Sequence, residues 1–263
     1  MTSLERVPVA GLVADIGPRS EAITKAVALI SGSDPGGPPA VVTALHVGGL
    51  VARNSPKFAD ALCSAGLVCA DGQSVLLLGW ATSGLRGERA STTDVGVPII
   101  VGVQRELGRP IRLALVGGPP GLAPRAGEVL AATTGGQIVF ACDGYQQSWR
   151  EVIARLNASA PDILVLGIGS PLETIWANDH RNELRVRGVI TCGGWFGFLA
   201  GDEMRAPKWM QMVGLEWSYR LIRDPHRLFG RYVRGAAVVA GLTLSAIVRR
   251  LDKAARVIRG RRV

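Results

Sequence analysis

The sequence has few of the residues and motifs that mark metal centres and disulfide scaffolds. It contains three histidines and four cysteines in 263 residues, without a Cys-x-x-Cys, His-Glu-x-x-His or Asp-x-Asp motif. The cysteines lie on or beside apolar runs, which favours buried free thiols in a reducing compartment over a disulfide framework. The spacings of the histidines and carboxylates likewise predict no metal site.

Signal sequences, membrane spans, internal repeats and low-complexity segments are also not recognisable. Met1–Arg19 lacks a basic start followed by an apolar core. The uncharged run Gly235–Val248 has fourteen residues, fewer than the about twenty that cross a bilayer as a helix. We therefore expect a cytoplasmic protein without a transmembrane segment.

Positive charge is concentrated at one end of the chain. The net charge is +9, and residues 220–263 hold twelve Lys or Arg and two Asp, so the other 219 residues carry a net charge of −1. This asymmetry predicts a near-neutral body, residues 1–219, and a basic C-terminal appendage that meets an anionic surface. Interleaved Ala, Val and Leu argue against nucleic acid and favour an interfacial helix on an anionic leaflet. The alternative is an ordinary helix packed on the body with a solvated basic end.

Short apolar runs alternate with helical stretches, which is typical of a parallel sheet covered by helices on both faces. Ligands of such sheets bind beyond the carboxyl ends of the strands. The expected helices include Ser20–Ile30 and Gly49–Ala65. The expected strands are Val7–Asp15, Ala40–Leu45, Gly66–Ala70, Ile111–Val116, Gln137–Ala141, Ile163–Ile168 and Gly188–Cys192.

Polar and glycine-rich motifs follow several of these strands. Asp71-Gly72 places a carboxylate where a cleft is expected, although the same dipeptide is typical of an ordinary turn. Gly117–Gly121 leads into a helical stretch, where free backbone N–H groups can face an anion. Asp143–Tyr145 and Gly167–Pro171 follow two further strands. The loops at one edge of the sheet are therefore the candidate site.

Arginines and tryptophans are concentrated between Gly193 and Tyr232. Forked guanidinium groups supported by rigid apolar side chains suit the binding of a phosphate or diphosphate. The residues are Trp195, Trp209, Trp217, Arg205, Arg220, Arg223, Arg227 and Arg231.

Five blocks of this stretch resemble, in order and spacing, the C-terminal signature of the WecG/TagA/CpsF glycosyltransferases. Pro161–Pro171 is similar to the same family's Pro-Asp-strand-Gly-x-Gly-x-Pro pattern, and the resemblance covers nearly the whole chain. It implies a Rossmann-like α/β fold with a helical C-terminal appendage. The five blocks are Gly193–Gly194, Arg205–Trp209, Gly214–Trp217, Arg220–Leu221 and Pro225–Arg227.

The resemblance implies roles for the matching residues. Asp71 is the expected catalytic base, which activates the acceptor hydroxyl in an inverting sugar transfer. Arginines are expected to neutralise the leaving diphosphate in place of a metal ion. The expected substrate-binding residues are His46, Thr93, Asp94, Gly117, Gly118, Tyr145, Gly167, Gly169, Pro171, Glu173, Arg205, Arg220, Arg223 and Arg227.

The sequence departs from the family pattern around the expected donor site. Leu45 stands where the family has Asn, so either His46 takes the polar role or the contact is absent, and in a structural role His46 would cap the strand end. Asp94 can bind a sugar hydroxyl and also act as a helix N-cap. The other departures are Thr92 for Gly, Glu173 for Gln, Thr174 for Glu and Gly197 for Asp.

The resemblance implies transfer of an N-acetylmannosamine-like or other hexosyl residue from a UDP-sugar to a polyprenyl-diphosphate-linked acceptor. No cofactor, metal or nucleic acid is expected, and homo-oligomerisation stays open. The expected location is the inner face of the cell membrane, with peripheral attachment through residues 220–263. The rival hypothesis is a catalytically altered regulatory or scaffold protein that binds a nucleotide-sugar, which the departures at Leu45, Glu173 and Thr174 favour.

Overall fold

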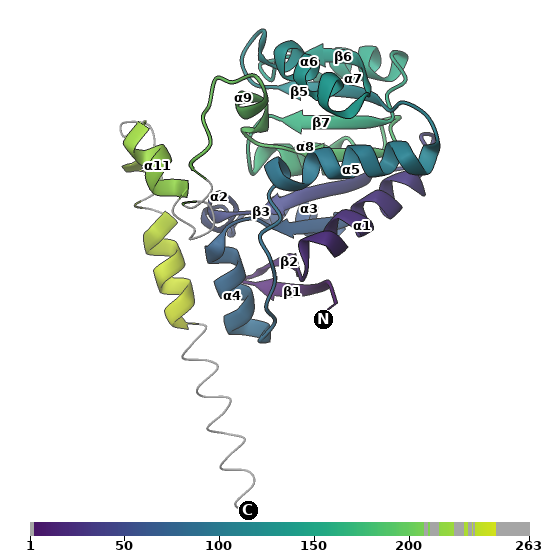
Figure 1. Ribbon diagram of the computed structural model, residues 1–263. Helices are drawn as coiled ribbons and strands as arrows, with labels where there is room; N and C mark the ends of the chain where they lie inside the picture. Colours follow the sequence, from purple (N-terminus) through teal and green to yellow (C-terminus); the bar gives the residue numbers. More distant parts are fainter. Residues whose placement is uncertain are drawn as a thin grey trace, which may run out of the picture.

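The computed structural model describes residues 3–207, 210, 216–223, 229–230, 233 and 235–245. Its centre is an eight-stranded sheet with helices on both faces (Figure 1). The strands are β1 Glu5–Val9, β2 Leu12–Ile16, β3 Ala40–Leu45, β4 Leu67–Ala70, β5 Arg112–Gly117, β6 Gln137–Cys142, β7 Ile163–Gly167 and β8 Gly188–Thr191. The helices are α1 Arg19–Ser31, α2 Val47–Val51, α3 Pro56–Ser64, α4 Gln73–Ser83, α5 Thr92–Leu107, α6 Leu122–Thr134, α7 Trp149–Ala158, α8 Leu172–Asp179, α9 Trp195–Leu199 and α11 Glu216–Arg223.

The sheet confirms the predicted α/β class. Its strand order is β1-β2-β4-β3-β8-β7-β5-β6, and every neighbouring pair is parallel except β1 with β2. The carboxyl ends of the six strands from β4 to β6 therefore lie along one edge of the sheet, here called the carboxyl edge.

Two apolar clusters, one on each face of the sheet, hold the layers together. Along β5, Ala114 and Val116 belong to one cluster, with α3, α4, α7 and α8. Leu113 and Leu115 belong to the other, with α1, α5, α6 and α9. This alternation follows from the two-residue period of a strand, and each fully buried aliphatic side chain contributes about 1.5–3 kcal/mol of transfer free energy.

The crossover connections between parallel strands all have the same handedness, and this determines which face each helix covers. Connections that move toward β6 pass over the face of α1, α5 and α6, and those that move toward β1 pass over the face of α3, α7 and α8. The neighbouring strands β3 and β8 consequently continue to opposite faces, into α2 and α9 respectively. Such a switch point opens a crevice at the carboxyl edge, where ligands of α/β sheets bind.

The N-terminal strand prediction, Val7–Asp15, is wrong, because this segment is a hairpin. Ala10 and Gly11 have φ values of 54° and 86°, which reverse the chain. β1 then pairs antiparallel with β2, and Pro8 is accommodated on an edge strand.

The predicted helix Gly49–Ala65 is likewise wrong as a single element. It is divided into α2 and α3, and the second helix begins at Pro56, whose missing N–H suits a first helical position. The hydroxyl of Ser55 accepts a hydrogen bond from the N–H of Phe58 at 3.4 Å and caps the new helix.

Part of the basic appendage lies against the body. Residues 235–245 form a helix, which Figure 1 draws beside α2 and α4. Its Val238, Val239 and Leu242 pack on the same cluster as Leu50 of α2 and Val75 of α4. Among the described helices, none combines the length and hydropathy needed to cross a bilayer. The contact of residues 220–263 with an anionic surface stays a prediction.

Candidate functional site

Asp71 lies at the carboxyl edge, between two other segments of the chain. Its N–H donates to the carbonyl of Leu45, the last residue of β3, at 2.9 Å. On the other side, the N–H of Ala90 donates to the carbonyl of Ala70 at 3.0 Å. Gly72, which follows, has a φ of 98° and starts α4. The backbone of the predicted base is therefore fixed between β3 and the segment that enters α5.

His46 acts as a helix cap in this structure. Its Nδ1 accepts a hydrogen bond from the N–H of Gly48 at 3.0 Å and satisfies a free donor at the start of α2. The accepting Nδ1 places the proton of the neutral ring on Nε2. A β-carbon at Gly48 would lie 2.7 Å from the His46 ring, so glycine is required at this close contact.

Arg89, Asp94 and Arg205 form a second group beside Asp71. Asp94 Oδ2 lies 2.8 Å from Arg89, and Oδ1 lies 2.9 Å from Arg205. Ser91, not Asp94, occupies the N-cap position of α5, and its hydroxyl donates to Asp94 at 2.7 Å. Thr93 joins the group through a 2.9 Å bond with the Ser91 hydroxyl.

The charge of Asp94 is held by its partners. Burial alone would raise its pKa, but the hydrogen bonds from Ser91 and Arg205 and the positive charge of Arg89 together hold the pKa below its usual value. Asp94 is thus an ionised anchor that two guanidiniums share, so the three side chains together carry a net positive charge.

The glycine motif after β5 is tied to its neighbours. The N–H of Gly118 donates to the carbonyl of Gly167 at 3.1 Å, and the carbonyl of Gly118 accepts from Gly144 at 2.9 Å. Gly117 has a φ of 147°, and a β-carbon there would lie 2.3 Å from the carbonyl oxygen of Gly167. The predicted helix follows as α6, but the N–H of Gly118 is already engaged within the protein.

Glu173 holds the loops that follow β7 and β8. Its side chain is 4% exposed, with Oε2 3.0 Å from the N–H of Gly169 and both oxygens 3.1 Å from the N–H of Gly193. Burial raises its pKa to about 7, against the opposing effect of these N–H donors. Pro171 immediately precedes α8 as its N-cap.

The remaining predicted residues do not all meet at one point. Tyr145 follows β6 and is 78% exposed. Five strand spacings of about 4.8 Å separate β6 from β4, so Tyr145 lies about 24 Å along the edge from Asp71. Arg220 and Arg223 lie on α11. Arg227 lies outside the described residues.

Sequence reasoning missed a buried hydroxyl network under the site. The hydroxyl of Thr43 in β3 lies 2.8 Å from that of Thr174 in α8 and accepts from Thr191 in β8 at 2.9 Å. The only sequence signal was the departure at Thr174. Glu203 was also missed. It follows Gly197 by six residues and fills the space beside it, where a β-carbon on Gly197 would lie 3.1 Å from Glu203 Cγ.

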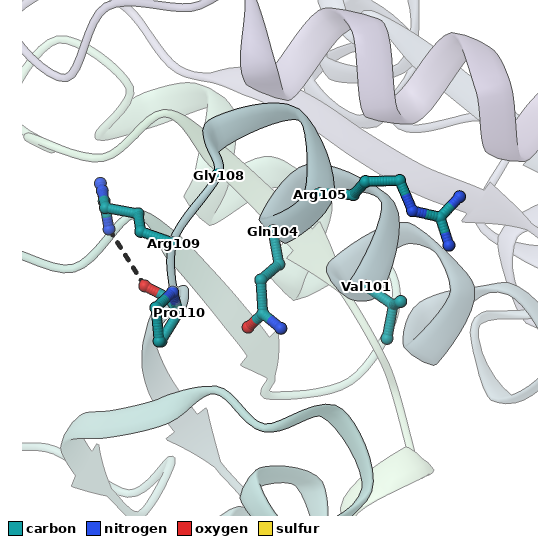
Figure 2. Close-up of a pocket in the computed structure, with 6 residues that line it drawn as sticks. All are labelled: Val101, Gln104, Arg105, Gly108, Arg109 and Pro110. Atoms are coloured by element: carbon teal, nitrogen blue, oxygen red, sulfur yellow. Dashed lines mark hydrogen bonds between the residues drawn. The ribbon is translucent and has the colours of Figure 1, made fainter.

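A surface hollow of about 420 Å³ lies at the end of α5 and before β5, away from the carboxyl edge (Figure 2). Its polar groups serve the fold: Arg109 binds Asp162 at 2.6 and 2.8 Å and Gln104 donates to the carbonyl of Thr134. This hollow is therefore no competitor for the candidate site. Within the described part of the chain, no group of three or more His, Cys, Asp or Glu side chains could hold a metal ion.

The fold and site define an α/β protein with a carboxylate and a cationic cluster at the carboxyl edge of a parallel sheet. Residues 7–253 match the model of the Glycosyl transferase WecG/TagA/CpsF family, so the chain belongs to this family of glycosyltransferases. Among curated proteins, the chain is similar to the N-acetylglucosaminyldiphosphoundecaprenol N-acetyl-beta-D-mannosaminyltransferase of Bacillus spizizenii. The two are 26% identical over 189 residues, which are 71% of this chain and 72% of the relative. The family expected from the sequence motifs is confirmed.

Proposed function

We propose that this protein transfers a hexosyl residue, of the N-acetylmannosamine type or a close analogue, from a UDP-sugar to a polyprenyl-diphosphate-linked acceptor. The reaction inverts the anomeric centre and supplies cell-surface polysaccharide synthesis. Family membership supports sugar transfer. The relative's name describes the transfer of an N-acetylmannosaminyl group to N-acetylglucosaminyldiphosphoundecaprenol.

The observation that carries the proposal is the position of Asp71 between two fixed segments. Its backbone is bonded to the end of β3, and the neighbouring strand end is bonded to the segment that carries Arg89. Arg89 and Arg205 share the carboxylate of Asp94, so a carboxylate and a cationic pair belong to one bonded framework. A base and a cationic cluster are the two functions that an inverting transfer with a diphosphate leaving group needs.

In the proposed reaction, the oxygen of the acceptor hydroxyl attacks the anomeric carbon while Asp71 accepts the proton of that hydroxyl. The bond from that carbon to the diphosphate oxygen breaks, and UDP leaves with the electron pair. Arg89 and Arg205 stabilise the charge that develops on the diphosphate, together with Arg220, Arg223 and Arg227 of the appendage. No metal ion takes part in this scheme.

A panel of UDP-sugars, each incubated with a short-chain lipid-diphosphate acceptor, tests the proposal. Release of UDP with formation of a glycosylated lipid, and inversion shown by NMR of the product, are expected. A protein that binds UDP-sugars but releases no UDP with any pair would instead support the regulatory or scaffold hypothesis.

A further inference from the structure

Glu173 connects two loops that are far apart in sequence but adjacent in space. Gly169 follows β7 and Gly193 follows β8, and the two N–H groups donate to one carboxylate at 3.0 and 3.1 Å. Both glycines have positive φ values, 90° and 52°, which other residues rarely adopt. The carboxylate therefore fixes two glycine turns at the carboxyl edge.

The next residue extends this connection to a third strand. Thr174 lies 2.8 Å from Thr43 of β3, and Thr43 accepts from Thr191 of β8. All three threonine residues are at most 2% exposed. The first turn of α8 thus bonds to β3 and to the loops that follow β7 and β8, around the switch point between β3 and β8.

We propose that Glu173 is a positioning residue, which acts on sugar transfer by holding the Gly169 and Gly193 loops and not by touching the donor. Its two oxygens already accept three hydrogen-bond contacts, and the side chain is 4% exposed. The hydrogen bonds from Gly169 and Gly193 to Glu173 are here called the Glu173 clamp. The inference rests on the proposed function only for its effect on transfer, because the clamp itself can be observed without substrate.

The clamp depends on the charge of the carboxylate. An ionised carboxylate accepts from both glycines, whereas a proton on Oε1 would face the N–H of Gly193 and remove an acceptor. The pKa of about 7 places this change near neutral pH, with burial as the main cause. Among the described residues, no cationic side chain contributes to this pKa, and the adjacent Cys192 thiol stays neutral because burial and Glu173 raise its pKa well above the usual value.

The first experiment observes the clamp in the full chain without substrate. With ¹⁵N-glycine labelling, the amide shifts of Gly169 and Gly193 should titrate together, with a midpoint near pH 7. The titration should disappear in Glu173→Gln, which retains an acceptor oxygen but cannot ionise. Independent behaviour of the two amides, or an unchanged titration in Glu173→Gln, would overturn the clamp.

The second experiment measures its effect on transfer. Glu173→Gln should show at pH 8 the kcat/KM that the wild type shows at pH 6, because its amide, like the protonated carboxyl, offers one acceptor oxygen in place of two. It should also lose the activity change that the wild type shows between pH 6 and 8. Glu173→Ala should lower kcat/KM by about 10²-fold, the cost of a small misplacement of reacting groups. The matched control is Glu183→Gln, which changes an exposed carboxylate after α8 and should retain the wild-type pH profile.

Two results would contradict a positioning role. Equal losses of donor affinity in the Gln and Ala variants would show that the charge touches the donor. A lower melting temperature of Glu173→Ala with unchanged kcat/KM would show a structural role only. If the glycine amides titrate as expected but the wild type transfers no sugar, the clamp stands and the proposed function fails.

Discussion

The carboxylate of Asp94 lies 2.9 Å from the guanidinium of Arg205, across a separation of 111 residues in the chain. The contact joins the first turn of α5 to the segment that follows α9. Through Arg89, the same carboxylate is connected to the segment beside Asp71. An arginine from the motif-rich C-terminal region is thereby fixed to the segment whose Ala90 is hydrogen-bonded to Ala70, the residue before the proposed base.

Replacement of Asp71 by Asn should abolish transfer and leave the fold intact. Loss of a positioned general base costs about 10²–10⁴-fold in rate, while the amide has nearly the same shape. The measurements are kcat, UDP-sugar affinity by calorimetry and the melting temperature. Asp143→Asn is a matched control, because Asp143-Gly144 also follows a strand at the carboxyl edge. Comparable turnover in the two variants would remove Asp71 from the mechanism.

Arg205 and Asp94 should be coupled in stability and in turnover. Arg205→Ala and Asp94→Ala should each destabilise the protein, and the double variant should show a coupling free energy of about 0.5–3 kcal/mol. Arg205→Lys should recover turnover incompletely, because a single ammonium cannot reproduce the forked guanidinium. Urea unfolding and kcat measure both effects.

The control for this pair is Arg125 with Asp202, a two-pronged ion pair at 2.6 and 2.8 Å. Both of its side chains are about half exposed, and solvent weakens such pairs. Its double-mutant cycle should give little coupling and unchanged turnover. Equal coupling in the two cycles would show that Asp94 and Arg205 have no special role at the site.

Glu173→Gln should change how stability depends on pH. The folded-state pKa of Glu173, about 7, exceeds its ordinary value of 4.5, so the protonated folded form is favoured. Its contribution to stability is complete below pH 4.5 and is lost as pH rises to about 7, with a span of about 3 kcal/mol. The melting temperature of Glu173→Gln relative to wild type should therefore rise between pH 4.5 and 7 and level off above it. A constant difference would show that Glu173 does not titrate in this range.

Much of the fold could be predicted because strand periodicity is local. The bounds of β3 were predicted to the residue as Ala40–Leu45, since an apolar run between a Gly/Pro-rich loop and a polar residue is unambiguous. The hairpin within Val7–Asp15 was hidden, because Ala10 and Gly11 continue the apolar run through the turn. The break before Pro56 had a readable signal in Ser55-Pro56.

The candidate site was predictable only in part. Strand ends and glycine motifs indicated the carboxyl edge, because parallel strands share it. The Glu173 clamp and the threonine network join residues 20 and 131–148 positions apart. Such contacts depend on which loops meet after folding, and the sequence pattern does not specify them. For the same reason, the sequence did not predict that the N–H of Gly118 donates to the carbonyl of Gly167.

Transfer should be independent of divalent metal ions. Arginines supply the positive charge that the proposed reaction needs at the leaving diphosphate. Turnover in EDTA should equal turnover with added Mg²⁺ or Mn²⁺. Loss of activity in EDTA, with recovery on adding either ion, would show that a metal neutralises the diphosphate.

Removal of positive charge from the end of the appendage should weaken binding to anionic vesicles without disturbing the body. The variant Arg249→Gln/Arg250→Gln/Lys253→Gln is preferable to truncation, because Val238, Val239 and Leu242 pack on the core and their loss would expose it. Each basic residue near an anionic surface contributes about 1 kcal/mol, so the triple variant should bind about 10²-fold more weakly.

The matched control removes the same charge from exposed sites of the body, as Arg86→Gln/Arg105→Gln/Arg150→Gln. Sedimentation with phosphatidylglycerol vesicles should separate the two variants, and both should keep wild-type turnover on a water-soluble acceptor. Binding of the wild type should also fall as salt rises, because the attraction is screened within about 10 Å at 0.1 M salt. If the body variant loses binding and the appendage variant keeps it, the membrane-facing surface is the body, and the basic appendage serves another role.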